Sequence, residues 1–209
     1  GGAFFIALFL QNLTLLSGVF LILSVVLKIR TILWLALLFF ISSLFFLDNL
    51  TYFIERLDFS ENNKNFSTLA FLSGWERAYL NLIESGGLGI GFQQLGNIGP
   101  YGHYMEKIYS IMFIYLNLND GATTGSKFIS ELGLFAIFLL FAYAIKTTHY
   151  IHRLKTNKDS LPLKDIFFYS VYIMLIIELF IRGSGYFTGT ILLFCTAIFY
   201  FSTESGVNR

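Results

Sequence analysis

The first 27 residues carry no charged side chain, and this apolar stretch constrains the fold more than any other feature of the sequence. About 20 predominantly apolar residues are enough for a helix to cross the hydrocarbon core of a bilayer. Of the 209 residues, 56% are hydrophobic and only 13% are charged, which is about half the charged share of a typical soluble domain. A water-soluble chain of this length cannot bury so much apolar surface. We therefore predict an all-α integral membrane protein.

The composition also excludes several classes of function. The single cysteine, Cys195, cannot support a disulfide framework or a cysteine-based metal site. The formal net charge is +1, so the chain lacks the basic field that nucleic-acid binding needs. No spacing of His, Cys, Asp and Glu is typical of a metal site. We expect no nucleic acid, metal or cofactor as a partner. The chain begins with Gly1 rather than Met, and we interpret it as part of a longer protein.

Five apolar segments are predicted membrane spans in a single membrane domain. They cover residues 4–27, 31–53, 128–146, 165–181 and 186–202. The polar pair Gln11 and Asn12 leaves an alternative for the first span, in which residues 1–10 end one helix and a new helix begins near Asn12. The last two spans are short for the thickness of a bilayer.

The basic residues orient these spans, because cytoplasmic loops are enriched in Lys and Arg. Two of them separate the first two spans, and five more flank the connection between the third and fourth spans. These residues are Lys28 and Arg30, and then Lys146, Arg153, Lys155, Lys158 and Lys164. Both connections are therefore predicted to be cytoplasmic. The long segment 54–127 then faces the periplasm.

The outer segment 54–127 is the predicted location of the functional site. Residues 55–67 are polar and predict a loop, whereas the apolar periodicity of residues 68–85 predicts a helix. Residues 108–118 are apolar but too short to span, which predicts a re-entrant or interface-lying helix. Between these helices lies a run of glycines, which predicts an irregular backbone with positive φ or close packing. The glycines are at positions 86, 87, 89, 91, 96, 99 and 102.

Arg77 is the first candidate for a binding site. It lies just before the glycine run, and a guanidinium binds phosphate through two parallel hydrogen bonds while staying charged. Backbone N–H groups of a glycine-rich turn can add an anion-binding nest. Arg77 is thus a candidate diphosphate ligand. The alternative is a surface arginine that pairs with Glu76 or Glu84.

Two pairs of opposite charges lie at predicted outer helix ends. Lys127 and Glu131 are four residues apart and share a helix face, as do Glu178 and Arg182. Charges near a membrane span are expensive and favour a functional role, although a local ion pair explains each spacing equally well. His103, in the glycine-rich loop, is either a catalytic base or a structural residue.

Four stretches resemble bacterial O-antigen polymerases and O-antigen ligases. The sequence SGWER at residues 73–77, followed by GLGIGF at residues 87–92, resembles the Arg-containing helix and glycine motif of their large periplasmic loop. Residues 120–135 resemble the transition from loop to helix in polymerases of O-antigen repeat units. Residues 13–18 are similar to the Thr/Ser-rich helix start of the family. The resemblance covers most of the chain, in matching order.

The resemblance implies a GT-C type membrane glycosyltransferase, of which this chain would be the C-terminal part. The donor would be a glycan on undecaprenyl diphosphate, and no metal or nucleotide sugar would be needed. The acceptor would be another lipid-linked repeat unit for a polymerase, or lipid A–core for a ligase. Ligases carry a His near the start of the helix that follows the loop. This chain has Thr124, Ser126 and Lys127 there, which favours the polymerase.

We therefore predict a polysaccharide polymerase in the bacterial inner membrane, acting in O-antigen and lipopolysaccharide biosynthesis. Its expected partners are the undecaprenyl-diphosphate-linked donor and acceptor, membrane lipid and, as a further candidate, a chain-length regulator protein. Positive charge would stabilise the departing diphosphate, and a base would take the proton of the acceptor hydroxyl. The candidates are Arg77, Lys127 and Arg182 for diphosphate, and Glu76, His103, Asp120 and Glu131 for the base. The alternatives are an O-antigen ligase, or half of a lipid or polysaccharide transporter without catalysis.

Overall fold

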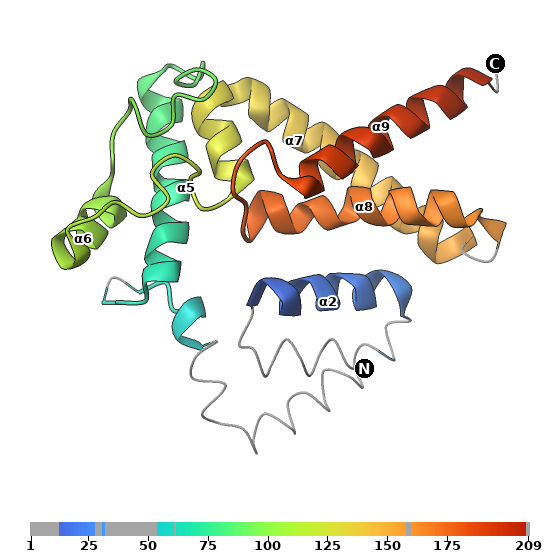
Figure 1. The fold of residues 1–209 in the computed structure, drawn as a ribbon, viewed down its shortest axis with the longest axis horizontal. Helices are drawn as coiled ribbons and strands as arrows, with labels where there is room; N and C mark the ends of the chain where they lie inside the picture. Colours follow the sequence, from blue (N-terminus) through green and yellow to red (C-terminus); the bar gives the residue numbers. More distant parts are fainter. Residues whose placement is uncertain (1–12, 28–30, 32–53, 61, 158–159, 208–209) are drawn as a thin grey trace. The chain divides into compact units, whose positions relative to one another are not determined.

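The computed structural model describes residues 13–27, 31, 54–60, 62–157 and 160–207, which form helices joined by loops (Figure 1). The predicted all-α class is confirmed for these residues, where the one β feature is an isolated bridge between Leu95 and Ile98. The chain divides into two compact units, Gly1–Thr68 and Leu69–Arg209.

The first unit contains α2, Leu13–Val26, an uncharged apolar helix within the predicted span 4–27. Its first residue lies next to the helix start that the alternative places near Asn12. Residues 4–12 and 32–53, and with them most of the predicted second span, lie outside the described residues. For the segment 55–67, predicted as a loop, residues 58–60 and 62–65 form loop, whereas residues 54–57 form a short helical turn and residues 66–67 belong to the next helix.

The predicted helix 68–85 is confirmed as α5, Phe66–Glu84. It begins where the Asn65 side-chain oxygen accepts hydrogen bonds from the backbone N–H groups of Ser67 (3.1 Å) and Thr68 (3.4 Å). Such a side-chain cap satisfies amides that have no partner inside the helix. In the second unit, α5 continues with Leu69 and Ala78 buried.

The loop between α5 and α7 has the irregular backbone that its glycines predict. Each of the seven glycines from position 86 to position 102 has a positive φ. The helix predicted over residues 108–118 is wrong in its bounds, because α6 spans His103–Met112. It ends at Phe113, whose left-handed backbone (φ 56°) stops the helix, and residues 114–123 form turns and loop.

Three helices complete the second unit: α7, Thr124–Asn157; α8, Leu163–Phe180; and α9, Gly189–Val207. α7 contains the predicted span 128–146, whereas α8 ends one residue before the end of the predicted span 165–181 and α9 begins three residues after the start of the predicted span 186–202. α8 packs against both α7 and α9 (Figure 1). Among the described residues, α7 is the one helix that is long and apolar enough to cross a membrane. The membrane location and the number of spans stay predictions.

α7 is kinked at Gly133, whose backbone angles (φ 59°, ψ −135°) are not helical. The kink separates a short first segment, which packs against the glycine-rich loop, from a straight segment over residues 134–157. At 1.5 Å per residue the straight segment is about 36 Å long, which exceeds the roughly 30 Å of a hydrocarbon core. The first segment of α7, residues 124–132, is therefore not needed to reach across a bilayer and packs with the glycine-rich loop.

Candidate functional site

Arg77 lies in the middle of α5 and is almost completely buried, with 1% of its surface exposed. Its Nη1 donates a hydrogen bond to the carbonyl oxygen of Leu118 at 2.8 Å. Its Nε and Nη2 are buried and have no hydrogen-bond partner among the described residues. Burial lowers the pKa of the guanidinium, and the nearby Tyr101 acts in the opposite direction. A guanidinium nevertheless stays protonated in a protein, so Arg77 is a buried positive charge.

Arg77 is the central member of a polar stripe on α5. Ser73 and Asn81 lie one helical turn before and after it, and both are fully buried. The Ser73 hydroxyl and both polar atoms of the Asn81 amide have no hydrogen-bond partner among the described residues. Buried polar groups are normally bonded, so three consecutive turns with unused hydrogen-bonding capacity are unusual. We call Ser73, Arg77 and Asn81 the polar stripe of α5.

Lys127 and Glu131 form a buried ion pair on the first segment of α7. The Lys127 Nζ lies 3.0 Å from the Glu131 Oε1, as the i, i+4 spacing predicts. The ammonium also donates to the Asn119 carbonyl oxygen (2.6 Å) and to the Gln93 Oε1 (3.2 Å). The charge of Lys127 is therefore already neutralised, which makes this residue a weaker diphosphate ligand than Arg77.

Both carboxylate oxygens of Glu131 also accept hydrogen bonds from other segments. Oε1 accepts the backbone N–H of Leu95 (3.2 Å), and Oε2 accepts the backbone N–H of Gln93 (2.9 Å). Oε2 also accepts the Tyr186 hydroxyl at 2.8 Å. The carboxylate thus fixes the glycine-rich loop and the α8–α9 connection to α7. These contacts favour a structural role for Glu131 over a role as a catalytic base.

Arg77 and Lys127 donate hydrogen bonds to the carbonyl groups of two consecutive loop residues. Arg77 donates to the carbonyl of Leu118, and Lys127 donates to the carbonyl of Asn119. Arg182 is exposed in the connection after α8, and in the part of the chain that the structure describes no contact links it to the polar stripe. The predicted pairing with Glu178 is not formed there either, since the Glu178 Oε1 accepts the backbone N–H of Ser184 (3.5 Å) instead.

The three remaining candidates for the base lie in the loop or next to it. The Glu76 carboxylate accepts the backbone N–H groups of His103 (2.9 Å) and Tyr104 (2.8 Å), and so caps α6. The His103 ring is exposed and packs edge-on against Tyr104. The Asp120 Oδ1 accepts the backbone N–H of Ala122 (3.0 Å) in the turn that leads into α7. His103 and Asp120 therefore keep the most hydrogen-bonding capacity for a substrate.

No protein-family model, curated protein or solved structure matches the chain. The resemblance to O-antigen polymerases therefore rests on the sequence motifs alone. Among the described residues, no group of three or more His, Cys, Asp and Glu side chains is placed to hold a metal ion.

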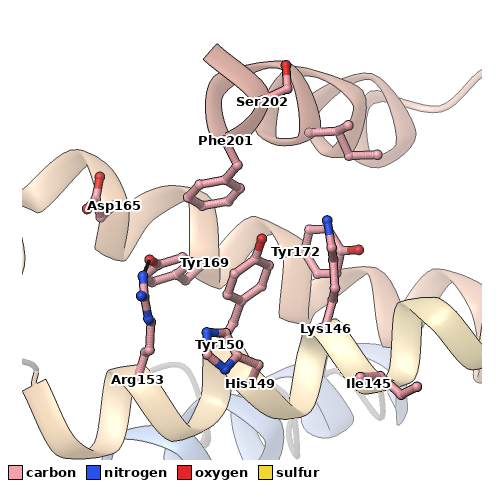
Figure 2. Close-up of a pocket in the computed structure, with 11 residues that line it drawn as sticks. Ile145, Lys146, His149, Tyr150, Arg153, Asp165, Tyr169, Tyr172, Phe201 and Ser202 are labelled. Atoms are coloured by element: carbon pink, nitrogen blue, oxygen red, sulfur yellow. Dashed lines mark hydrogen bonds between the residues drawn. The ribbon is translucent and has the colours of Figure 1, made fainter. Parts of the chain in front are cut away.

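A pocket that the sequence motifs do not predict lies between α7, α8 and α9, away from Arg77. This pocket has a volume of about 790 Å³ (Figure 2). The signal available in the sequence was the spacing of Lys146, His149 and Arg153, which places three basic side chains on one face of α7.

The cap that Glu76 provides leads to a first prediction. Replacing Glu76 by Ala removes an anionic acceptor from the N-terminus of α6 and is expected to destabilise that helix by about 1 to 2 kcal/mol. Hydrogen exchange of the amides of His103 and Tyr104 should become faster. Replacing the exposed Glu84 by Ala removes the same charge and should leave these amides unchanged. Equal protection of the two amides in wild type and Glu76→Ala would contradict the capping role.

Proposed function

We propose that the chain is the C-terminal part of a membrane glycosyltransferase that polymerises lipid-linked repeat units. The observation that carries this proposal is the buried guanidinium of Arg77, which within the described part of the chain has no carboxylate partner and two unbonded nitrogens. Burying a charge is costly unless an opposite charge and hydrogen bonds compensate for it. A diphosphate supplies both, because its oxygens accept the parallel N–H groups of a guanidinium. The motifs at residues 73–77 and 87–92 support the same assignment.

The proposed substrates are two glycans on undecaprenyl diphosphate at the outer face of the bacterial inner membrane. The reaction breaks the bond between the anomeric carbon of the donor sugar and the diphosphate oxygen. A new bond forms from that carbon to a hydroxyl oxygen of the acceptor repeat unit. The diphosphate leaves with the electron pair of the broken bond, and the proton of the hydroxyl passes to a base. Product chains would become part of O-antigen or a related surface polysaccharide.

The residues divide these tasks as follows. Arg77 stabilises the charge that develops on the departing diphosphate, and this contribution is large in a site that excludes water. His103 and Asp120 are the candidate bases, because the carboxylates of Glu76 and Glu131 are occupied by backbone amides. Lys127 holds the carbonyl next to the one that Arg77 contacts, and so positions this part of the loop.

Substitution of Arg77 tests the proposal in cells that carry the full-length protein. We expect Arg77→Gln to reduce long polysaccharide chains about 100-fold or more, the loss typical of removing one donor to a charged transition state. Arg77→Lys keeps the charge without the two parallel donors and should recover a small part of the activity. Polysaccharide length on denaturing gels is the measurement. Lys64→Gln, an exposed position outside the site, is the matched control.

Two further readouts make the result decisive. The amount of each variant in the membrane fraction shows whether the substitution affects folding, and only variants at wild-type level are compared. A polymerase that is inactive still leaves single repeat units attached to lipid A–core, whereas a failed transporter leaves no repeat units on the outer face. Unchanged chain lengths in Arg77→Gln would contradict the proposal, and the loss of all repeat units would favour the transporter.

A further inference from the structure

A second site lies away from the polar stripe of α5, in the pocket between α7, α8 and α9 (Figure 2). Its wall is aromatic. Tyr150 of α7 stacks on Tyr169 of α8 with 4.6 Å between ring centroids, and Tyr169 stacks on Phe201 of α9 at 5.0 Å. The two tyrosines are buried, so these three helices hold a rigid surface behind the pocket.

Basic side chains line one side of this pocket. Lys146, His149 and Arg153 follow one another on a single face of α7 and are exposed (Figure 2). Arg153 is oriented by a hydrogen bond from its Nη1 to the Tyr169 hydroxyl oxygen at 3.0 Å. The one acidic residue in the lining, Asp165, accepts a hydrogen bond from the Tyr200 hydroxyl at 2.6 Å. Two positive charges and one negative charge leave the pocket with +1 when His149 is neutral.

The basic face of α7 continues into an exposed apolar track. Ile145 lines the pocket, and Phe141 and Phe138 precede it by about one and two helical turns on the same face. Their exposed fractions are 58%, 66% and 66%. From residue 138 to residue 149 the helix rises about 16 Å, about half the thickness of a hydrocarbon core. A cationic end followed by an apolar track of this length matches a phospholipid in one leaflet.

We propose that this pocket binds an anionic phospholipid of the cytoplasmic leaflet. Lys146 and Arg153 contact the headgroup phosphate, the aromatic wall packs against the glycerol region, and an acyl chain lies along Ile145, Phe141 and Phe138. Basic pockets between helices at the cytoplasmic surface attract anionic headgroups for the same electrostatic reason. The inference rests on the membrane location and orientation within the proposed function, and it is independent of the reaction at Arg77.

Lipid binding by the purified full-length protein in detergent tests this inference. The probes are fluorescent phosphatidylglycerol and fluorescent phosphatidylcholine of equal acyl length. We expect wild type to prefer phosphatidylglycerol, and the double variant Lys146→Gln/Arg153→Gln to lose about tenfold in affinity for it. The control is Lys64→Gln/Lys155→Gln, which changes the net charge equally at two exposed positions outside the pocket lining. It should bind as wild type does.

Two further measurements separate a lipid from a soluble anion. Inorganic phosphate at millimolar concentration should not displace phosphatidylglycerol, and Ile145→Ser should weaken lipid binding because it interrupts the apolar track. Displacement by phosphate would overturn the lipid assignment, as would equal losses in the double variant and its control. If the double variant does not remain monodisperse, Lys146→Gln alone replaces it. Arg77→Gln should keep full lipid binding. A failure of the polymerase proposal would therefore appear in the polysaccharide chain lengths, and a failure of the lipid proposal in the binding of phosphatidylglycerol.

Discussion

Replacing Glu131 by Gln is expected to lower the free energy of unfolding by about 3 to 5 kcal/mol, the cost of leaving one member of a buried ion pair without its partner. Lys127 would keep its positive charge with only 4% of its side chain exposed. The remaining acceptors, the Asn119 carbonyl and the Gln93 amide oxygen, are neutral. Denaturant or thermal unfolding of the purified full-length protein in detergent measures the difference.

Two other substitutions test whether the loss of stability in Glu131→Gln comes from the buried ion pair. Glu178→Gln removes a half-buried carboxylate whose one hydrogen bond among the described residues is long, at 3.5 Å, and should change the stability by less than about 1 kcal/mol. Lys127→Met combined with Glu131→Gln removes both charges and should recover part of the stability. If Glu131→Gln unfolds like wild type, the ion pair does not hold the loop to α7.

Gly133→Ala is expected to have an effect of similar size, about 3 kcal/mol or more, because it combines backbone strain with a collision. A Cβ atom at Gly133 would lie 2.0 Å from the carbonyl oxygen of Gly87 and 2.7 Å from the backbone nitrogen of Gly89. Both neighbours are backbone atoms, and the Gly87 carbonyl accepts the N–H of Leu134 at 2.8 Å. Neither can move without separating the loop from α7.

The two causes can be separated with glycines of the same chain. Gly86 also has a positive φ (62°) but no atom within 4 Å of an added Cβ, so Gly86→Ala measures the cost of a positive φ without a collision, about 1 to 2 kcal/mol. Gly189 at the start of α9 has neither strain nor a close neighbour, and Gly189→Ala should be neutral within about 1 kcal/mol. A loss in Gly133→Ala no greater than in Gly86→Ala would contradict the collision.

The local features of the structure were predictable from the sequence. α5 follows from its apolar periodicity, the positive φ angles follow from the glycines, and the contact between Lys127 and Glu131 follows from their spacing of four residues. Each of these depends on residues close together in the chain. The bounds of α6 were not predictable from the apolar run 108–118, because its first turn is fixed by Glu76, more than 20 residues earlier.

The arrangement of the candidate site depends on contacts between distant segments. The sequence identifies Arg77 as a candidate, but not its burial or its bond to the carbonyl of Leu118, 41 residues later. It also identifies Glu131, whose partners in the glycine-rich loop and at Tyr186 occupy the carboxylate. The sequence pattern therefore leaves the Glu131 carboxylate available as a base, whereas the fold uses it in hydrogen bonds to distant segments. Arg182 has the opposite outcome, since its predicted neighbour Glu178 bonds elsewhere and the arginine is exposed.

The consecutive carbonyls of Leu118 and Asn119 have a consequence for the electrostatics of this region. One receives its hydrogen bond from α5 and the other from α7, so the two cations bind adjacent peptide groups that belong to neither helix and meet at Asn119. A change in the backbone dihedral angles of Asn119, which joins these two peptide groups, would reorient one carbonyl relative to the other and so alter the hydrogen bonds of both cations. The distance between the buried charge of Arg77 and the neutralised charge of Lys127 therefore depends on the backbone conformation of two loop residues, and the two helices need not shift for the local potential to change.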